Sequence, residues 1–317
     1  MSAESFGRGW LGLAALLWLV VSSGLVHAQQ SADTTFDTRV ARPAYAGQGP
    51  RVLFDEAHNN FHTSDGRYLP FATLMRADGC VVTPNKAFFS ASTLAHADIL
   101  VIANALGHEK MDHADARLPA FTAAECDVVR DWVRGGGALL LIADHAPMGG
   151  AARTLAARFG VEMHAAYTVD PEREDDGRVS ILSYSAARGL DEAHAIVRGR
   201  DSSETVRRVV CFTGQSLSGP PGSESLLTLS PRAVDLLVGL GQSLEHVKPR
   251  QRVSAAGRSQ ALAFGYGKGR VVVLAEAAMM TAQVAGPRRT PMGMNAPGNN
   301  DRQFALNIMR WLGGALR

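Results

Sequence analysis

Cysteine is scarce in this sequence. The 317 residues include only Cys80, Cys126 and Cys211. None of them has the C-x-x-C spacing of a metal or redox site, and an odd number leaves at least one thiol unpaired. Cys126 falls in a predicted helix and Cys80 at the start of a predicted strand. We therefore expect buried, structural roles for these thiols.

Runs of one charge are missing as well. The formal net charge is +2, with 46% hydrophobic and 20% charged residues. This is the composition of an ordinary globular domain with a sizeable core. Proteins that bind nucleic acids through charge carry a larger and clustered basic excess. We therefore expect no nucleic-acid partner.

Two familiar catalytic signatures are also absent. The sequence contains no H-E-x-x-H, the helical zinc motif, and no G-x-S-x-G, the elbow that carries a nucleophilic serine. The segment Gly214-Gln-Ser-Leu-Ser218 resembles such an elbow but lacks the second glycine at the required spacing. The sequence therefore gives no support to either of these motif-defined hydrolase classes.

The one long apolar run lies at the N-terminus. Residues 10–21 are almost all apolar, they follow a polar stretch with Arg8, and Val26-His27-Ala28 places small residues before Gln29. A membrane-spanning helix needs about 20 apolar residues, so this pattern predicts a signal peptide over 1–28 and an exported protein, periplasmic or secreted. An uncleaved N-terminal anchor is the alternative. No later segment is apolar enough to predict a stable membrane span.

Strands and helices alternate through the following segment. Buried strands are predicted at 51–55, 80–83, 98–103 and 138–143, and helices at 68–78, 122–134 and 150–159. Continuous apolar strands are typical of a parallel sheet that is covered on both faces. The alternation predicts an α/β fold, a doubly wound and mostly parallel sheet with helices on both faces.

The remaining elements are predicted to complete one domain over residues 50–317. Residues 29–49 are polar and predict a linker, and the charged stretch near 164–205 predicts a surface insert. Two strands around Gly265-Tyr-Gly-Lys-Gly269 predict a β-hairpin, and 301–316 predicts a closing helix. The long loop that precedes this helix contains residues 286–300, for which a lid and an ordinary loop are equal alternatives.

Polar residues follow the predicted strands at their carboxyl ends, where open α/β sheets bind ligands. We therefore predict one site at this edge. The candidate catalytic residues are Asp55, His58, Asp144 and His145. The candidate ligand-binding residues are Glu56, Asn59, Asn60, His62, Asn104, Gly149, Gly150, Glu276, Asn299 and Asn300.

Several kinds of chemistry fit this set. His145 or Asp55 could act as a general base, and the backbone N–H groups of Gly149 and Gly150, at the start of a helix, could bind an anion. A divalent metal is the alternative cofactor, with His58, His62 and His145 as candidate ligands beside Asp144. Each residue also has a structural explanation, since an aspartate after a strand commonly caps a helix or forms a turn.

Several segments resemble the class I glutamine-amidotransferase-like superfamily, most closely its exported bacterial members of unknown function. They are the D-E-x-H-x-N segment that begins at Asp55, the Gly135–His145 segment, the Tyr266–Val273 segment and Asn307-Ile-Met-Arg-Trp-Leu312. The resemblance covers most of the chain after the predicted signal peptide. It implies a flavodoxin-like sandwich with helices on both faces of the sheet.

The working amidotransferases of that superfamily use a cysteine at a nucleophile elbow, with histidine and glutamate partners. The corresponding slot after Ala143 holds Asp144-His145, which implies a protein without glutaminase activity. We expect an exported domain that binds a small polar ligand, a sugar or cell-envelope fragment, at the Asp/His edge. A hydrolytic reaction is one version of this hypothesis; a non-catalytic envelope binding or scaffolding module and a metal-dependent hydrolase are alternatives. The sequence leaves turnover and oligomeric state open.

Overall fold

The computed structural model describes residues 30–175, 177–239 and 247–317. The predicted signal peptide, 1–28, lies outside the described residues. Among the described residues, no helix has both the length and the apolar character needed to cross a bilayer.

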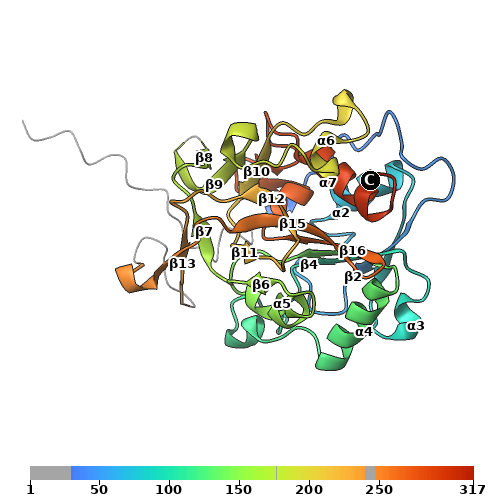
Figure 1. The fold of residues 1–317 in the computed structure, drawn as a ribbon, viewed down its shortest axis with the longest axis horizontal. Coiled ribbons are helices and arrows are strands. Elements are labelled where there is room, and N and C mark those ends of the chain that lie inside the picture. Colours follow the sequence, from blue (N-terminus) through green and yellow to red (C-terminus); the bar gives the residue numbers. More distant parts are fainter. Residues whose placement is uncertain (1–29, 176, 240–246) are drawn as a thin grey trace, which may run out of the picture.

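A mixed sheet, nine-stranded within the described residues, forms the centre of the molecule (Figure 1). Its strands lie in the order β3 (Val81–Asn85), β2 (Arg51–Asp55), β4 (Ile99–Ala103), β5 (Ala138–Ile142), β16 (Gly269–Leu274), β15 (Ser259–Tyr266), β11 (Leu217–Ser218) and β6 (Glu162–Met163), and β12 (Glu224–Thr228) also pairs with β15. Neighbours from β3 to β16 are parallel, whereas β15 runs antiparallel to β16. Every residue of β4 and β5 is buried, as the continuous apolar runs predict.

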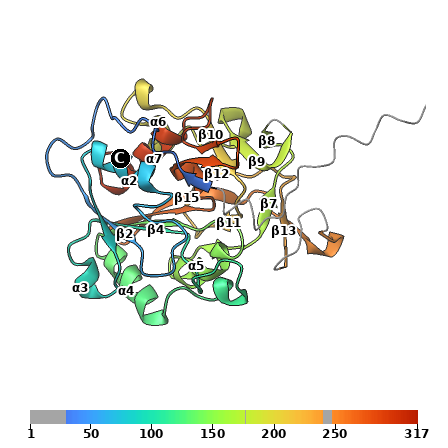
Figure 2. The same cartoon turned by 180° about the vertical axis from the view of Figure 1, so that it is seen from behind.

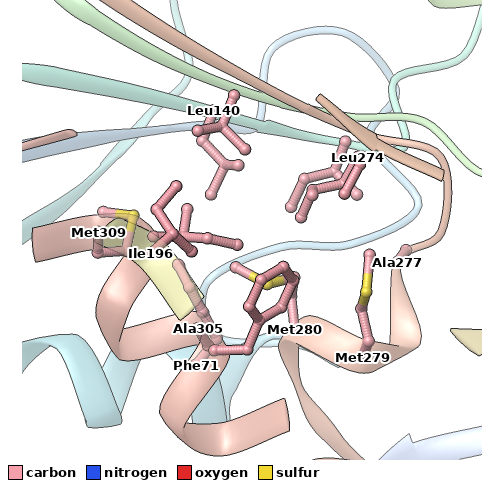
Figure 3. Close-up of a cluster of buried hydrophobic side chains, with 14 of the residues drawn as sticks. Phe71, Leu140, Ile196, Leu274, Ala277, Met279, Met280, Ala305 and Met309 are labelled. Atoms are coloured by element: carbon pink, nitrogen blue, oxygen red, sulfur yellow. The ribbon is translucent and has the colours of Figure 1, made fainter. Parts of the chain in front are cut away.

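Helices lie on both faces of this sheet (Figures 1 and 2). One face is covered by α2 (Leu69–Ala77), α6 (Ala195–Arg198) and α7 (Asp301–Leu312), and the other by α3 (Ala91–Leu94), α4 (Ala123–Arg134) and α5 (Met148–Ala157). Since side chains alternate along a strand, Leu140 belongs to one core and Leu139 to the other. Figure 3 shows the first core, in which Leu140 and Leu274 of the sheet face Phe71 and Met309 of the helices.

Local sequence signals explain how the main helices begin and end. Helix α4 starts with the predicted capping box, in which the Thr122 hydroxyl accepts from the backbone N–H of Glu125 and the Glu125 carboxylate accepts from that of Thr122. Gly79 follows α2 with φ of +98°, a conformation that favours glycine. The chain therefore turns directly from α2 into β3.

Residues 30–49 belong to the folded domain rather than to a linker. Strand β1 (Gln30–Ala32) pairs with β17 (Ala282–Ala285). Phe36, Val40 and Tyr45 then pack against the core. These three residues bury apolar area that a polar linker would not carry, so the segment is held to the domain by packing and by a strand pair.

The predicted surface insert near 164–205 also contributes to the core. It contains β7 (Tyr167–Val169), β8 (Glu174–Asp175), β9 (Arg178–Tyr184), η2 (Ala186–Arg188), α6 and η3 (Ser202–Glu204). Leu182, Tyr184 and Ile196 are fully buried. Strand β9 pairs with β10 (Val209–Phe212), and β7 joins β13 (Val234–Leu236) and β14 (Arg252–Ser254). Apolar side chains of this segment therefore pack inward, and Asp170 and Glu204 are buried with them.

The segment before α7 is structured as well, where a long loop was predicted. It contains η6 (Ala278–Met280), β17 and β18 (Thr290–Gly293). Strand β17 pairs with β18 as a hairpin. Short 3-10 turns elsewhere are η1 (Ala114–Arg117) and η5 (Pro249–Gln251). The predicted hairpin of β15 and β16 and the closing helix α7 are both present.

Candidate functional site

The loops that follow β2, β4 and β5 are joined by hydrogen bonds. The Phe61 N–H donates to the carbonyl of Asn104 at 2.9 Å, and the Asn104 side-chain oxygen accepts from the Asp144 N–H at 2.9 Å. The Leu106 N–H donates to the His58 carbonyl at 3.0 Å. Asn104 has φ of +50°, which asparagine tolerates better than most residues. The structure therefore brings the polar strand ends together at one edge of the sheet.

His58 lies between two carboxylates in the interior. Its Nδ1 is 2.9 Å from both oxygens of Asp55, and its Nε2 is 2.9 Å from Oε1 of Glu125. His58 is 2% exposed and Asp55 is fully buried. The ring is in contact with Phe88, Phe89 and Phe121. Both ring nitrogens are therefore used within the protein, in a closed network that we call the Asp55–His58–Glu125 network.

The electrostatics of this network favour a charged imidazole. Burial lowers the pKa of His58, but hydrogen bonds and attraction from Asp55 and Glu125 together outweigh it and raise that pKa above its usual value. Burial raises the pKa of Glu125, but hydrogen bonds from Thr122, His58 and Phe89 lower it overall. A histidinium between two carboxylates is a stabilising arrangement when every polar atom is paired.

The other predicted residues of the first loop have structural partners. Glu56 Oε1 accepts from the N–H and the hydroxyl of Ser64. The Asn59 amide donates to the Leu106 carbonyl, and Asn60 accepts from the His58 N–H while donating to Asp55. The loop is therefore organised by its own asparagines. The fourth residue, His62, is 4% exposed and packs against Tyr68.

The turn after β5 carries Asp144 and His145. Asp144 Oδ1 accepts from the N–H of His145 at 2.8 Å. The buried Gln215 side chain donates to the carbonyls of Ala143 and Asp144, at 2.8 and 3.0 Å. The His145 ring stacks on Tyr167, with ring centroids 4.0 Å apart, and its Nδ1 is 2.7 Å from the carbonyl oxygen of Ala146. This turn is therefore held in place from three sides.

Gly149 and Gly150 have packing roles at the start of α5. A Cβ atom at Gly149 would lie 2.4 Å from Nε2 of Gln215, and one at Gly150 would lie 3.0 Å from the carbonyl oxygen of Arg117. Their N–H groups donate to the carbonyls of His145 and Pro147. Since these amides already have partners within the turn, the predicted anion site at the two glycine N–H groups is not supported.

A cavity of about 970 Å³ opens beside this turn. It is lined by Met111, Asp112, His113, Ala114, Arg117, Pro119, His145, Ala146, Pro147, Gly150, Arg153, Thr154, His164, Ala165, Tyr167, Leu237, Val238, Gly239 and Gln251. Small-molecule sites typically have volumes of roughly 300 to 1,000 Å³. Of the predicted site residues, His145 and Gly150 contribute to its wall, whereas Asp55 and His58 do not. The edge thus divides into the closed network and an open cavity.

Two further side chains of the cavity have altered acidity. Burial and the nearby Asp144 raise the pKa of Tyr167 to about 12. Burial, together with Arg258, lowers the pKa of His164, whose Nε2 lies 3.1 Å from the hydroxyl of Ser218. Both side chains therefore remain uncharged at neutral pH and present polar but neutral groups to the cavity.

The three remaining predicted residues do not line the cavity. Glu276 is fully buried and accepts from the N–H groups of Ala278 and Met279; burial, with Asp144 nearby, raises its pKa well above the usual value. The Asn299 amide donates to a carbonyl, and the Asn300 oxygen accepts from the N–H groups of two arginines. These residues fix η6 and the start of α7.

The candidate metal ligands are not assembled into a metal site. Within residues 30–175, 177–239 and 247–317, no group of three or more His, Cys, Asp or Glu side chains is placed to hold a metal ion. His58 faces two carboxylates in the closed network, whereas His145 faces the cavity. The metal-dependent version therefore has no ligand set in the described part of the chain.

The sequence analysis missed several residues of the two sites. Glu125 was identified only as a helix cap, yet it also contacts His58 across 67 positions of sequence. Arg153 could have been found, because it lies three residues after Gly150 on a predicted helix and shares its face. Tyr167 and Gln215 come from segments without regular periodicity, so no local pattern indicates them.

The comparisons with known proteins bear on the fold. No family model and no curated protein matches this sequence. The N-terminal domain of mmIFT52 is similar in structure over 83% of this chain and 97% of that domain, with a TM-score of 0.55 and 14% identity. A ThuA-like protein from Bacteroides uniformis matches 86% of this chain and 93% of its own, with a TM-score of 0.45 and 12% identity. At 14% identity, the likeness to the mmIFT52 domain shows a similar fold and nothing about activity.

Proposed function

We propose that this protein binds a small polar ligand, a sugar or cell-envelope fragment, in the cavity beside His145. The observation that carries the proposal is the position of that cavity: it lies where strand β5 ends and α5 begins, and His145 and Tyr167 form part of its wall. Ligands of open α/β sheets commonly bind beyond the carboxyl ends of the strands. The cavity volume suits a ligand of one or a few sugar rings.

The second part of the proposal is hydrolysis with His145 as general base. Its Nδ1 faces the carbonyl of Ala146, and a carbonyl oxygen can only accept, so Nδ1 carries the proton in the neutral ring. The basic lone pair then belongs to Nε2, which lies 3.8 Å from Asp144 Oδ1. Asp144 would stabilise the imidazolium that forms when His145 takes a proton from water. Of the two predicted general bases, His145 and Asp55, the proposal keeps His145, because Asp55 is fully buried in the closed network.

We further infer that the chain is an exported, doubly wound member of the class I glutamine-amidotransferase-like superfamily without glutaminase activity. Support comes from the β5–α5 turn, where Asp144-His145 replaces a nucleophilic cysteine. All three cysteines are buried. Burial raises the pKa of Cys80 to about 12 and also raises the pKa of the other two thiols. Thiols in that state make poor nucleophiles.

Ligand titration followed by NMR tests the binding site. The probes are glucose, N-acetylglucosamine and a peptidoglycan disaccharide, and the variants are Tyr167→Ala and Phe88→Ala. Phe88 is the matched control, because it is 70% exposed and contacts His58 rather than the cavity. Binding that is lost in Tyr167→Ala and kept in Phe88→Ala supports the cavity. Equal effects of the two substitutions would place the ligand elsewhere.

Turnover is tested separately with the peptidoglycan disaccharide, whose glycosidic bond can be hydrolysed. Product formation by the wild-type protein and its loss in His145→Gln, with ligand affinity retained, supports the general base. Binding without any product identifies a non-catalytic binding module instead. The binding part of the proposal can therefore hold even if the hydrolytic part fails.

A further inference from the structure

We propose that the ligand of this cavity carries an anionic group, a carboxylate or a phosphate, which is bound by Arg117 and Arg153. The inference rests on the proposed function, since it specifies the chemistry of the ligand in the same cavity. It goes further by assigning two residues that the predicted site did not contain.

The two arginines start from adjacent positions of the fold. Arg117 ends η1, which packs directly on α5: a Cβ atom at Gly150 would lie 3.0 Å from the Arg117 carbonyl oxygen and 3.4 Å from its Cβ. Arg153 lies three residues after Gly150, on the same face of α5. Both arginines line the cavity. One stretch of the cavity wall therefore contains two arginine residues.

Neither guanidinium is neutralised by a carboxylate within the described residues. Arg153 Nε donates only to the backbone carbonyl of Met163, at 3.3 Å, and the Arg117 side chain has no hydrogen bond or ion pair with any described residue. Arg158, one turn later on the surface, is different: its Nε donates to Asp127 at 2.8 Å. Guanidinium groups stay charged at any physiological pH and bind oxyanions through paired N–H donors.

The remaining charged groups leave this stretch of wall positive. Asp112 is the one carboxylate among the lining residues. His113 is directed to its own helical turn, where its Nδ1 accepts from the Asp115 N–H. His164 is kept neutral by burial and by Arg258. Two permanent positive charges therefore face one negative charge, which favours an anionic ligand over a neutral or a cationic one.

Another part of the wall is apolar and suits the carbon skeleton of a sugar. Met111, Pro119, Pro147 and Leu237 contribute to it. A ligand that places a sugar ring against these side chains and an anionic group toward the arginines would match both parts. The geometry thus points to an acidic or phosphorylated sugar.

The test compares glucose, glucuronate and glucose 6-phosphate at constant ionic strength by isothermal titration. Charge-assisted hydrogen bonds are strong enough for the better anionic sugar to bind at least about tenfold more tightly than glucose. Arg117→Gln and Arg153→Gln should each remove most of this preference. Arg288→Gln is the matched control, since it removes the same charge from an exposed residue outside the cavity and should change nothing.

The outcomes separate the inference from the proposed function. If glucose binds as tightly as both anionic sugars, or if the two arginine substitutions act no more strongly than Arg288→Gln, the inference is overturned while the cavity remains a sugar site. If none of the three probes binds the wild-type protein, the inference is overturned, and titration with the peptidoglycan disaccharide then decides the proposed function. The relative affinity of glucuronate and glucose 6-phosphate decides between a carboxylate and a phosphate.

Discussion

Replacing His58 with glutamine removes the positive centre of the Asp55–His58–Glu125 network. The imidazole bridges carboxylates at 2.9 Å on either side, and both acids lie in the interior. Glutamine fills similar space but carries no charge. The two carboxylates would then remain buried without the cation that compensates them.

The expected loss of stability follows from the partners that remain. Removing one member of a buried ion pair costs about 3 to 5 kcal/mol. Asp55 keeps its bond from Asn60, and Glu125 keeps its bonds from Thr122 and Phe89. Because these contacts remain, we expect the lower end of that range, a free energy of unfolding smaller by about 3 kcal/mol. For a domain of this size, that corresponds to a Tm lower by about 6 to 12 °C.

The loss should depend on pH with a definite sign. Because the pKa of His58 is raised in the folded protein, its stabilising contribution is fully present below the unfolded value of 6.5 and disappears as pH rises through the folded pKa. The lowered pKa of Glu125 means that its contribution is present above 4.5 and disappears as pH falls through its folded pKa. The gap between wild type and His58→Gln should therefore be widest near pH 6 and narrow in alkaline solution.

Urea unfolding at about pH 6 and about pH 9 measures this gap. His96→Gln serves as the control, because His96 is exposed and should leave stability unchanged at both values. Adding Glu125→Gln to His58→Gln should cost less than the sum of the two single changes, since it removes one of the stranded carboxylates. A stability gap of equal size at both pH values would refute a charged imidazole in the network.

Two other buried contacts give sharp predictions. Asp301 is fully buried, its Oδ1 accepts from the Val210 N–H, and its Oδ2 has no hydrogen-bond partner among the described residues; burial raises its pKa well above the usual value. Its protonated form is therefore favoured. Asp301→Asn should have a free energy of unfolding within about 1 kcal/mol of the wild-type value and should lack the loss of stability that accompanies rising pH. Asp301→Ala should lower the free energy of unfolding by about 1 to 3 kcal/mol, and urea unfolding measures both variants. Gly149→Ala places a Cβ atom against the Gln215 side chain and should lower the free energy of unfolding by about 1 to 3 kcal/mol. Gly265→Ala is the control and should have little effect, because no atom lies closer than 4.0 Å to the added Cβ. Equal Tm values for these two variants would contradict the packing argument.

The central sheet was predictable because its signals are local. Residues 51–55 form β2 as predicted, and the apolar runs near 98–103 and 138–143 form β4 and β5. The capping box at Thr122 and the hairpin of β15 and β16 were equally clear. In each case, a few adjacent residues specify the element without help from distant partners.

The segment near 164–205 was not predictable, because its strands depend on distant pairing. β7 is three residues long and pairs with β13, more than sixty positions away. In β9, Leu182 and Tyr184 are fully buried, and the charged residues that precede this strand conceal its apolar pattern. The cavity wall depends on the same segment through Tyr167, so the position of the cavity could not be predicted either.

The predicted polar residues do lie at one edge of the sheet, but this edge divides into two parts with different properties. The first part is the Asp55–His58–Glu125 network, which fixes the loop after β2. Backbone hydrogen bonds from Leu106 to His58 and from Phe61 to Asn104 connect this loop to the loop after β4. The Asn104 side chain then accepts a hydrogen bond from the N–H of Asp144. His58 thus acts on the cavity indirectly, by positioning the turn that presents His145. Because its ring nitrogens are already occupied, it contributes rigidity to the site, and contact with the ligand is left to the residues of the cavity wall.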